Sequence, residues 1–83
     1  MRLNILYFAA LREALACDAE DVTLPPTVTT VGELRAFLLA RGEPWQALGS
    51  KSIRAALNQR MAGADALLQA GDEVAFFPPV TGG

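Results

Sequence analysis

The sequence predicts an α+β fold in which one main helix packs across one face of a small mixed sheet. Several segments alternate apolar and polar residues with the period of a strand, and one segment has the apolar spacing of a long helix. At 83 residues the chain can build one hydrophobic core but is too short for two. We therefore expect residues 1–83 to form a single domain, with residues 78–83 as a projecting C-terminal tail.

The first half of the chain predicts two strands around a short helix. Residues 2–8 alternate as a strand with apolar side chains on both faces, which indicates a central position in the sheet. Residues 9–16 place Leu11 and Leu15 four apart among helix-forming residues. Residues 21–24 alternate as a half-exposed strand that ends at two prolines, which is typical of an edge strand.

The main helix is predicted to begin at Thr30. Thr30 and Glu33 have the spacing of a capping box, in which each residue satisfies a backbone N–H of the other. The helix would end at Gly42, a residue that readily adopts positive φ. Its apolar stripe, which would face the sheet, consists of Val31, Leu34, Phe37 and Leu38.

The second half of the chain predicts strands joined by turns. A single turn over residues 44–48 is followed by a strand over residues 53–57, which closes on the turn-forming pair Asn58 and Gln59. Met61 and Ala62 can add a short ladder. The last strand is predicted over residues 73–77.

Composition excludes several classes of function. The chain has no histidine and one cysteine, which excludes common zinc sites, His-dependent catalytic triads and an intrachain disulfide, so no metal site is expected. The net charge is −2 with scattered basic residues, so we expect no nucleic-acid binding. We expect a cytoplasmic protein, because we find neither a signal peptide nor an apolar run of the roughly 20 residues that span a membrane.

Two polar features have ordinary explanations. Cys17 has no cationic neighbour in sequence that would lower its pKa, so it is expected to be a small packed residue. The segment 49–52, Gly-Ser-Lys-Ser, lacks the second glycine of a Walker loop and the aspartate expected before a phosphopantetheine serine, so it is expected to be a solvated loop.

The end of the chain is the strongest functional signal. Pro78 and Pro79 directly follow the last strand and favour an extended conformation that holds the following residues away from the sheet. Gly82 and Gly83 lack Cβ atoms and can therefore enter a narrow channel. This combination indicates a tail that inserts into another protein.

The segment 71–83, GDEVAFFPPVTGG, closely resembles the C-terminus of the MoaD family, the small subunits of molybdopterin synthase. The resemblance extends more loosely through the opening strand and through Leu57, Asn58 and Gln59. It implies a β-grasp, ubiquitin-like fold. It also implies that the protein is a sulfur carrier, which is not catalytic alone and donates sulfur within a sulfurtransferase complex, a heterotetramer with the large subunit.

The resemblance assigns the chemistry to Gly83. An adenylating activating enzyme would use ATP to activate its carboxylate, and a sulfurtransferase system would convert it to a thiocarboxylate. The thiocarboxylate would donate sulfur to cyclic pyranopterin monophosphate inside the large subunit, where Val80, Thr81 and Gly82 accompany it. No metal or organic cofactor bound to this subunit is implied.

A partner interface follows from strand alternation. Because the first and last strands are neighbours in a β-grasp sheet, Phe76 is expected under the helix and Phe77 beside Phe8 on the opposite face. Met61 would extend this apolar patch. The predicted partner interface is therefore Phe8, Met61, Phe77, Pro78 and Pro79. Mutual covering of Phe8 and Phe77, or cover by the short helix, is the alternative.

Other functions remain open at this point. A thiamine-type sulfur carrier or a ubiquitin-related modifier would share the fold and the Gly-Gly end, although the Pro78 and Pro79 pair favours the molybdopterin branch. A ubiquitin-like interaction module would use the same surface without chemistry. A self-contained enzyme is disfavoured because the chain has no histidine and no convincing acidic pair.

Overall fold

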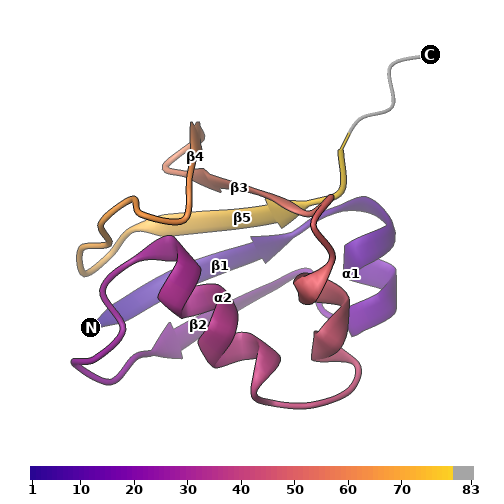
Figure 1. Cartoon of the computed structure of the whole chain (residues 1–83), viewed down its shortest axis with the longest axis horizontal. Coiled ribbons are helices and arrows are strands. Elements are labelled where there is room, and N and C mark those ends of the chain that lie inside the picture. Colours follow the sequence, from indigo (N-terminus) through magenta and orange to yellow (C-terminus); the bar gives the residue numbers. More distant parts are fainter. Residues whose placement is uncertain (80–83) are drawn as a thin grey trace.

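A five-stranded mixed sheet with one helix across its face forms the framework of the protein (Figure 1). The computed structural model describes residues 1–79. Its elements, in chain order, are β1 (Arg2–Tyr7), α1 (Ala9–Leu15), β2 (Ala19–Thr23), α2 (Val31–Leu39), the 3-10 helix η1 (Trp45–Gly49), β3 (Arg54–Leu57), β4 (Arg60–Ala62) and β5 (Glu73–Phe77).

The strands are arranged in the order β2-β1-β5-β3-β4. The central pair, β1 and β5, is parallel, and the other neighbours are antiparallel. The predicted central position of β1 and the edge position of β2 are confirmed. β2 begins at Ala19, earlier than the alternation over residues 21–24 predicts, because Ala19 still pairs with Leu6 of β1.

The N-terminus of α2 has the predicted capping box. The Glu33 backbone N–H donates to the Thr30 hydroxyl over 3.2 Å, and the Glu33 carboxylate accepts from the Thr30 N–H over 3.1 Å. The same carboxylate accepts from the backbone N–H and the hydroxyl of Thr29. These bonds satisfy N–H groups that have no partner within the helix, and they hold the pKa of Glu33 below its ordinary value.

The hydrophobic core lies between α2 and the sheet. Leu34 and Leu38 of α2 are fully buried, and Phe37 at the side of the helix is half-buried. On the sheet side, the core takes alternate residues of the three inner strands: Leu3, Ile5, Tyr7, Ala55, Val74 and Phe76. Phe76 is 0% exposed, whereas Phe77 is half-buried on the other face. The predicted assignment of the two phenylalanines is therefore confirmed.

A tight turn joins the β3–β4 hairpin and fastens it to β5. Asn58 and Gln59 have φ angles of 51° and 69°, as a two-residue hairpin turn requires. The Asn58 side chain donates to the Asp72 carboxylate over 3.0 Å and accepts from the Glu73 N–H over 3.0 Å. The turn thus fixes the hairpin against the start of the last strand.

We predict that Phe76→Ala lowers the free energy of unfolding by about 3 to 5 kcal/mol, because it leaves a cavity in a fully packed core. Phe77→Ala should cost far less, because Phe77 is only half-buried. Urea unfolding of both variants measures the difference. A larger loss for Phe77→Ala would contradict the face assignment.

Candidate functional site: an apolar sheet face beside the last strand

The face of the sheet opposite α2 carries a continuous row of apolar side chains. Adjacent strands place these residues in register, one from each strand: Ala19, Leu6, Ala75, Ala56 and Met61. Met61, at the β4 end of the row, is 66% exposed. No helix covers this face in Figure 1. Within residues 1–79 no helix covers this row, in which Ala75 is buried, Leu6 and Ala56 are half-buried, and the ends are exposed.

Phe8 and Phe77 lie together at the end of this face. Tyr7 pairs with Phe76, and the Phe8 N–H donates to the Phe76 carbonyl over 3.2 Å, so the register continues and places Phe8 beside Phe77. Phe8 retains extended backbone angles and is 45% exposed. Cover by Phe77 or by α1 is thus partial, and a large part of an aromatic ring stays accessible to a binding partner.

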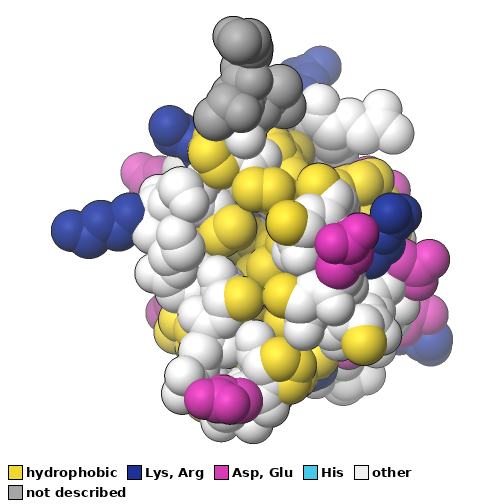
Figure 2. Space-filling view, turned by 90° about the vertical axis from the view of Figure 1, so that its right-hand side faces the viewer, with side chains coloured by type: hydrophobic (Ala, Val, Ile, Leu, Met, Phe, Trp, Pro, Cys, Tyr) yellow, Lys and Arg dark blue, Asp and Glu magenta, His cyan; other side chains and the backbone are white. Residues whose placement is uncertain are grey.

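The end of the molecule where β1 and β5 finish is also apolar. Figure 2 shows hydrophobic side chains gathered in a band on this end, with charged groups mostly around its margin. Pro78 is half-buried and Pro79 is exposed. The last strand therefore ends at the margin of the apolar surface.

The predicted reactive and tail-insertion residues, Val80, Thr81, Gly82 and Gly83, lie outside the described residues. The structure brings together Phe8, Phe77 and Pro78 at one end of the face, and it places Met61 at the β4 edge. The interface assignment of these residues stays a prediction.

A polar cluster that the sequence did not predict supports the end of β1, directly before Phe8. The Tyr7 hydroxyl donates to Glu20 over 2.8 Å, and Arg41 pairs with the same carboxylate over 3.0 Å. The Arg41 guanidinium also lies 4.4 Å from the centre of the Trp45 ring. Burial, followed by the bond to Glu20, raises the pKa of Tyr7 well above its ordinary value. A buried tyrosine signals a hydrogen-bond partner, but sequence spacing does not identify which one.

Cys17 is half-buried, and its surroundings do not activate it. Burial, followed by the charge of Glu20, raises the pKa of the thiol. The thiolate is the nucleophilic form, so a raised pKa lowers reactivity at neutral pH.

Within residues 1–79 no three His, Cys, Asp or Glu side chains are grouped to hold a metal ion. In the same range no helix is long and apolar enough to cross a membrane.

We predict that Cys17 reacts with iodoacetamide more slowly than free cysteine near neutral pH, because less of it is thiolate. Alkylation followed by intact mass spectrometry measures the rate, with urea-unfolded protein as the control. A rate above that of free cysteine would show an activated thiol.

Comparison with known proteins agrees with this architecture. Residues 5–83 match the model of the ThiS family. The chain is 43% identical over 82 residues to the molybdopterin synthase sulfur carrier subunit of Escherichia coli, covering 98% of this chain and 99% of the relative. Its identity with the corresponding subunit of Haemophilus influenzae is 39%, with the same coverage. SAMP1 from Haloferax volcanii has a similar structure, with a TM-score of 0.78, 26% identity and 100% coverage of both chains.

The mixed sheet with its crossing helix defines a ubiquitin-like protein of the β-grasp class. The chain belongs to the ThiS family. Its identity with the two bacterial subunits along nearly the whole chain makes it a MoaD-type sulfur carrier within that family.

Proposed function

We propose that this protein is the sulfur carrier subunit of molybdopterin synthase and that the Gly83 carboxylate is its working group. The observation that carries the proposal is the 43% identity with the Escherichia coli subunit over 98% of the chain. The family match extends to Gly83 itself. The apolar face beside the last strand gives such a carrier a surface with which to dock.

The chemistry requires activation of Gly83 by another protein. A carboxylate is a poor electrophile, so its oxygen first attacks the α-phosphate of ATP, which releases pyrophosphate and forms an acyl-adenylate. A nucleophilic sulfur atom at the sulfide level then displaces AMP and leaves a thiocarboxylate. Insertion of residues 80–83 into the large subunit would shield this group from water until it donates sulfur to cyclic pyranopterin monophosphate.

Three partners follow from this scheme. They are the large subunit of molybdopterin synthase, an adenylating enzyme that uses the ATP, and a sulfurtransferase system. The carrier itself needs no bound cofactor. We place the complex in the cytoplasm as a heterotetramer, in which the carrier contributes Gly83 and the large subunit binds the pterin.

Docking uses the uncovered sheet face. Phe8 and Phe77 supply accessible aromatic area at the end where the tail begins, and Met61 supplies an adaptable side chain at the other edge. Pro78 and Pro79 direct the chain onward from this contact. A partner seated on Phe8 and Phe77 is therefore close to the residues that precede the reactive terminus.

We predict that deletion of Gly83 abolishes sulfur donation without unfolding the domain. The full-length chain, incubated with its adenylating enzyme, ATP and sulfur donor, should gain the mass of one oxygen replaced by sulfur at its terminus. The deletion variant should show the same circular dichroism and no such gain. Molybdopterin formation by the deletion variant in a reconstituted assay would refute the assignment of Gly83.

We predict that Phe77→Ala weakens large-subunit binding by about 2 kcal/mol or more, as loss of an aromatic hot-spot contact does. Titration calorimetry with the large subunit measures the change. Leu67→Ala is the matched control, because Leu67 is also exposed but lies in the loop beside the start of α2. Equal losses for the two variants would exclude a specific docking role for Phe77.

A protein modifier is the second candidate, favoured by the structural similarity to SAMP1, a small archaeal modifier protein. It would share adenylation of Gly83 but would form an amide bond to a lysine side chain instead of delivering sulfur. A thiamine-type carrier would form the same thiocarboxylate. Molybdopterin formation in the presence of the large subunit separates the proposed function from both.

A further inference from the structure

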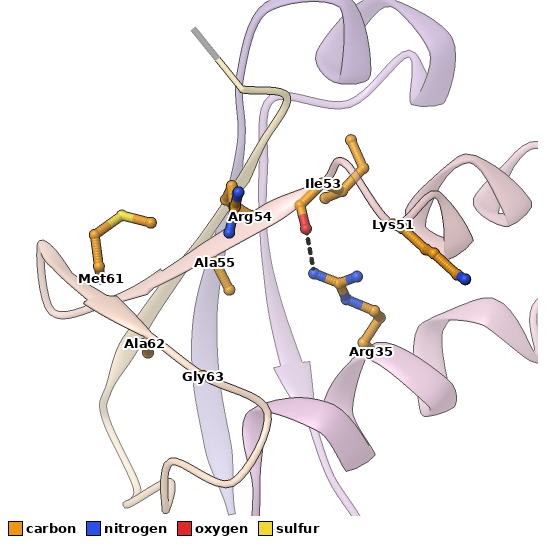
Figure 3. A pocket seen from close by; sticks show the side chains of 8 residues that line it. All are labelled: Arg35, Lys51, Ile53, Arg54, Ala55, Met61, Ala62 and Gly63. Atoms are coloured by element: carbon orange, nitrogen blue, oxygen red, sulfur yellow. Dashed lines mark hydrogen bonds between the residues drawn. The ribbon is translucent and has the colours of Figure 1, made fainter.

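A basic cleft lies at the open edge of β3, where Arg54, one of its lining residues, pairs with Phe77 of β5 on its other side. Its volume is about 400 Å³, and it is lined by residues of α2, the loop before β3 and the β3–β4 hairpin. β4 pairs with β3 only from Ala55 to Leu57, so the chain beyond Ala62 diverges and leaves Arg54 without a neighbour on that side. Figure 3 shows Arg35, Lys51 and Arg54 arranged around this opening.

The cleft is positively charged, although the chain as a whole has a net charge of −2. No acidic residue is among those that line it. Both ion pairs found within residues 1–79 use other cations, Arg2 and Arg41. The charges of Arg35, Lys51 and Arg54 are thus not neutralised by a carboxylate in the described part of the chain.

Arg35 is the cation of the cleft whose guanidinium has lost hydration through burial without gaining a carboxylate partner from residues 1–79. Its guanidinium donates to the Ile53 carbonyl over 2.7 Å and lies 5.8 Å from the centre of the Phe76 ring. Burial lowers the pKa of Arg35, with no carboxylate to oppose that effect. A half-buried guanidinium carries five N–H donors, so a carboxylate entering the cleft would compensate its lost hydration.

We propose that this cleft receives an acidic segment of the protein partner that docks on the uncovered sheet face. Met61 connects the two surfaces, because it ends the apolar row and also lines the cleft. A partner that covers Met61 can therefore continue around the β4 edge and place Asp or Glu side chains against the basic groups. This inference rests on the proposed docking function.

The geometry favours a protein segment over a single small anion. Figure 3 shows the Lys51 ammonium pointing away from the Arg35 guanidinium, and Arg54 projecting from the strand at a separate position. Because the three cationic groups point in different directions, they can each bind a different carboxylate along an extended peptide segment. A bound phosphate would instead need donors that converge on one point.

The first experiment measures large-subunit binding by the double variant Lys51→Glu/Arg54→Glu. We expect the dissociation constant at low salt to rise about tenfold and its dependence on salt to weaken, because exposed interfacial charges act on association in this way. Arg60→Glu is the control on the same hairpin, and its effect is compared per reversed charge because it reverses one charge and the double variant reverses two. Arg60 is an exposed cation on the same hairpin, but it pairs with Leu57 and does not line the cleft. Equal effects of the double variant and the control per reversed charge, or no effect of either, would overturn the proposal.

The second experiment uses the isolated chain and does not depend on the proposed function. Acetylated tetraglutamate should shift the amide resonances of Lys51, Ile53, Arg54 and Gly63 in NMR spectra, and tetraglutamine should not. Inorganic phosphate at equal ionic strength should have a smaller effect than tetraglutamate. Equal shifts with phosphate would identify a small-anion site and overturn the acidic-segment proposal. If the wild-type chain shows the tetraglutamate shifts but fails to bind the large subunit, the proposed function fails while the charge preference of the cleft stands.

Discussion

The parallel pairing of β1 with β5 is the constraint on which the rest of the structure depends. It joins the first and last strands at the centre of the sheet, so β2 and the β3–β4 hairpin can only add at the sides. It buries Phe76 under α2 and places Phe77 beside Phe8 on the opposite face. The C-terminal tail therefore begins at a strand that is paired on both sides and not at a loose edge.

Local patterns predicted most of the elements. The capping box of Thr30 and Glu33, the turn at Asn58 and Gln59 and the alternation of the last strand depend on neighbouring residues, and the structure contains all three. The same alternation separated Phe76 from Phe77, once the resemblance to the MoaD family indicated that β1 and β5 are neighbours. The order of the residues and their side-chain period were sufficient for the first three features, whereas the faces of Phe76 and Phe77 also required that resemblance.

The basic cleft and the Tyr7 cluster could not be predicted in this way. Arg35, Lys51 and Arg54 come from three separate segments, and Tyr7 meets Glu20 and Arg41 across β2 and the end of α2. No local spacing links such residues, because their proximity depends on how the elements pack. The early start of β2 has a similar origin, since Ala19 is held in the strand by its partner Leu6.

The alternation of Phe76 and Phe77 on one strand makes the packed core and the outer aromatic surface depend on the same strand pairing. A copy in which β5 has not joined the sheet lacks the packed core, and it also lacks the paired aromatic surface of Phe8 and Phe77. Under the proposed function, misfolded or proteolysed copies would then present a terminus without the surface that docks on the partner. Under that proposal, discrimination between intact and damaged carriers needs no separate recognition element, because one strand pairing forms both the core and the docking surface.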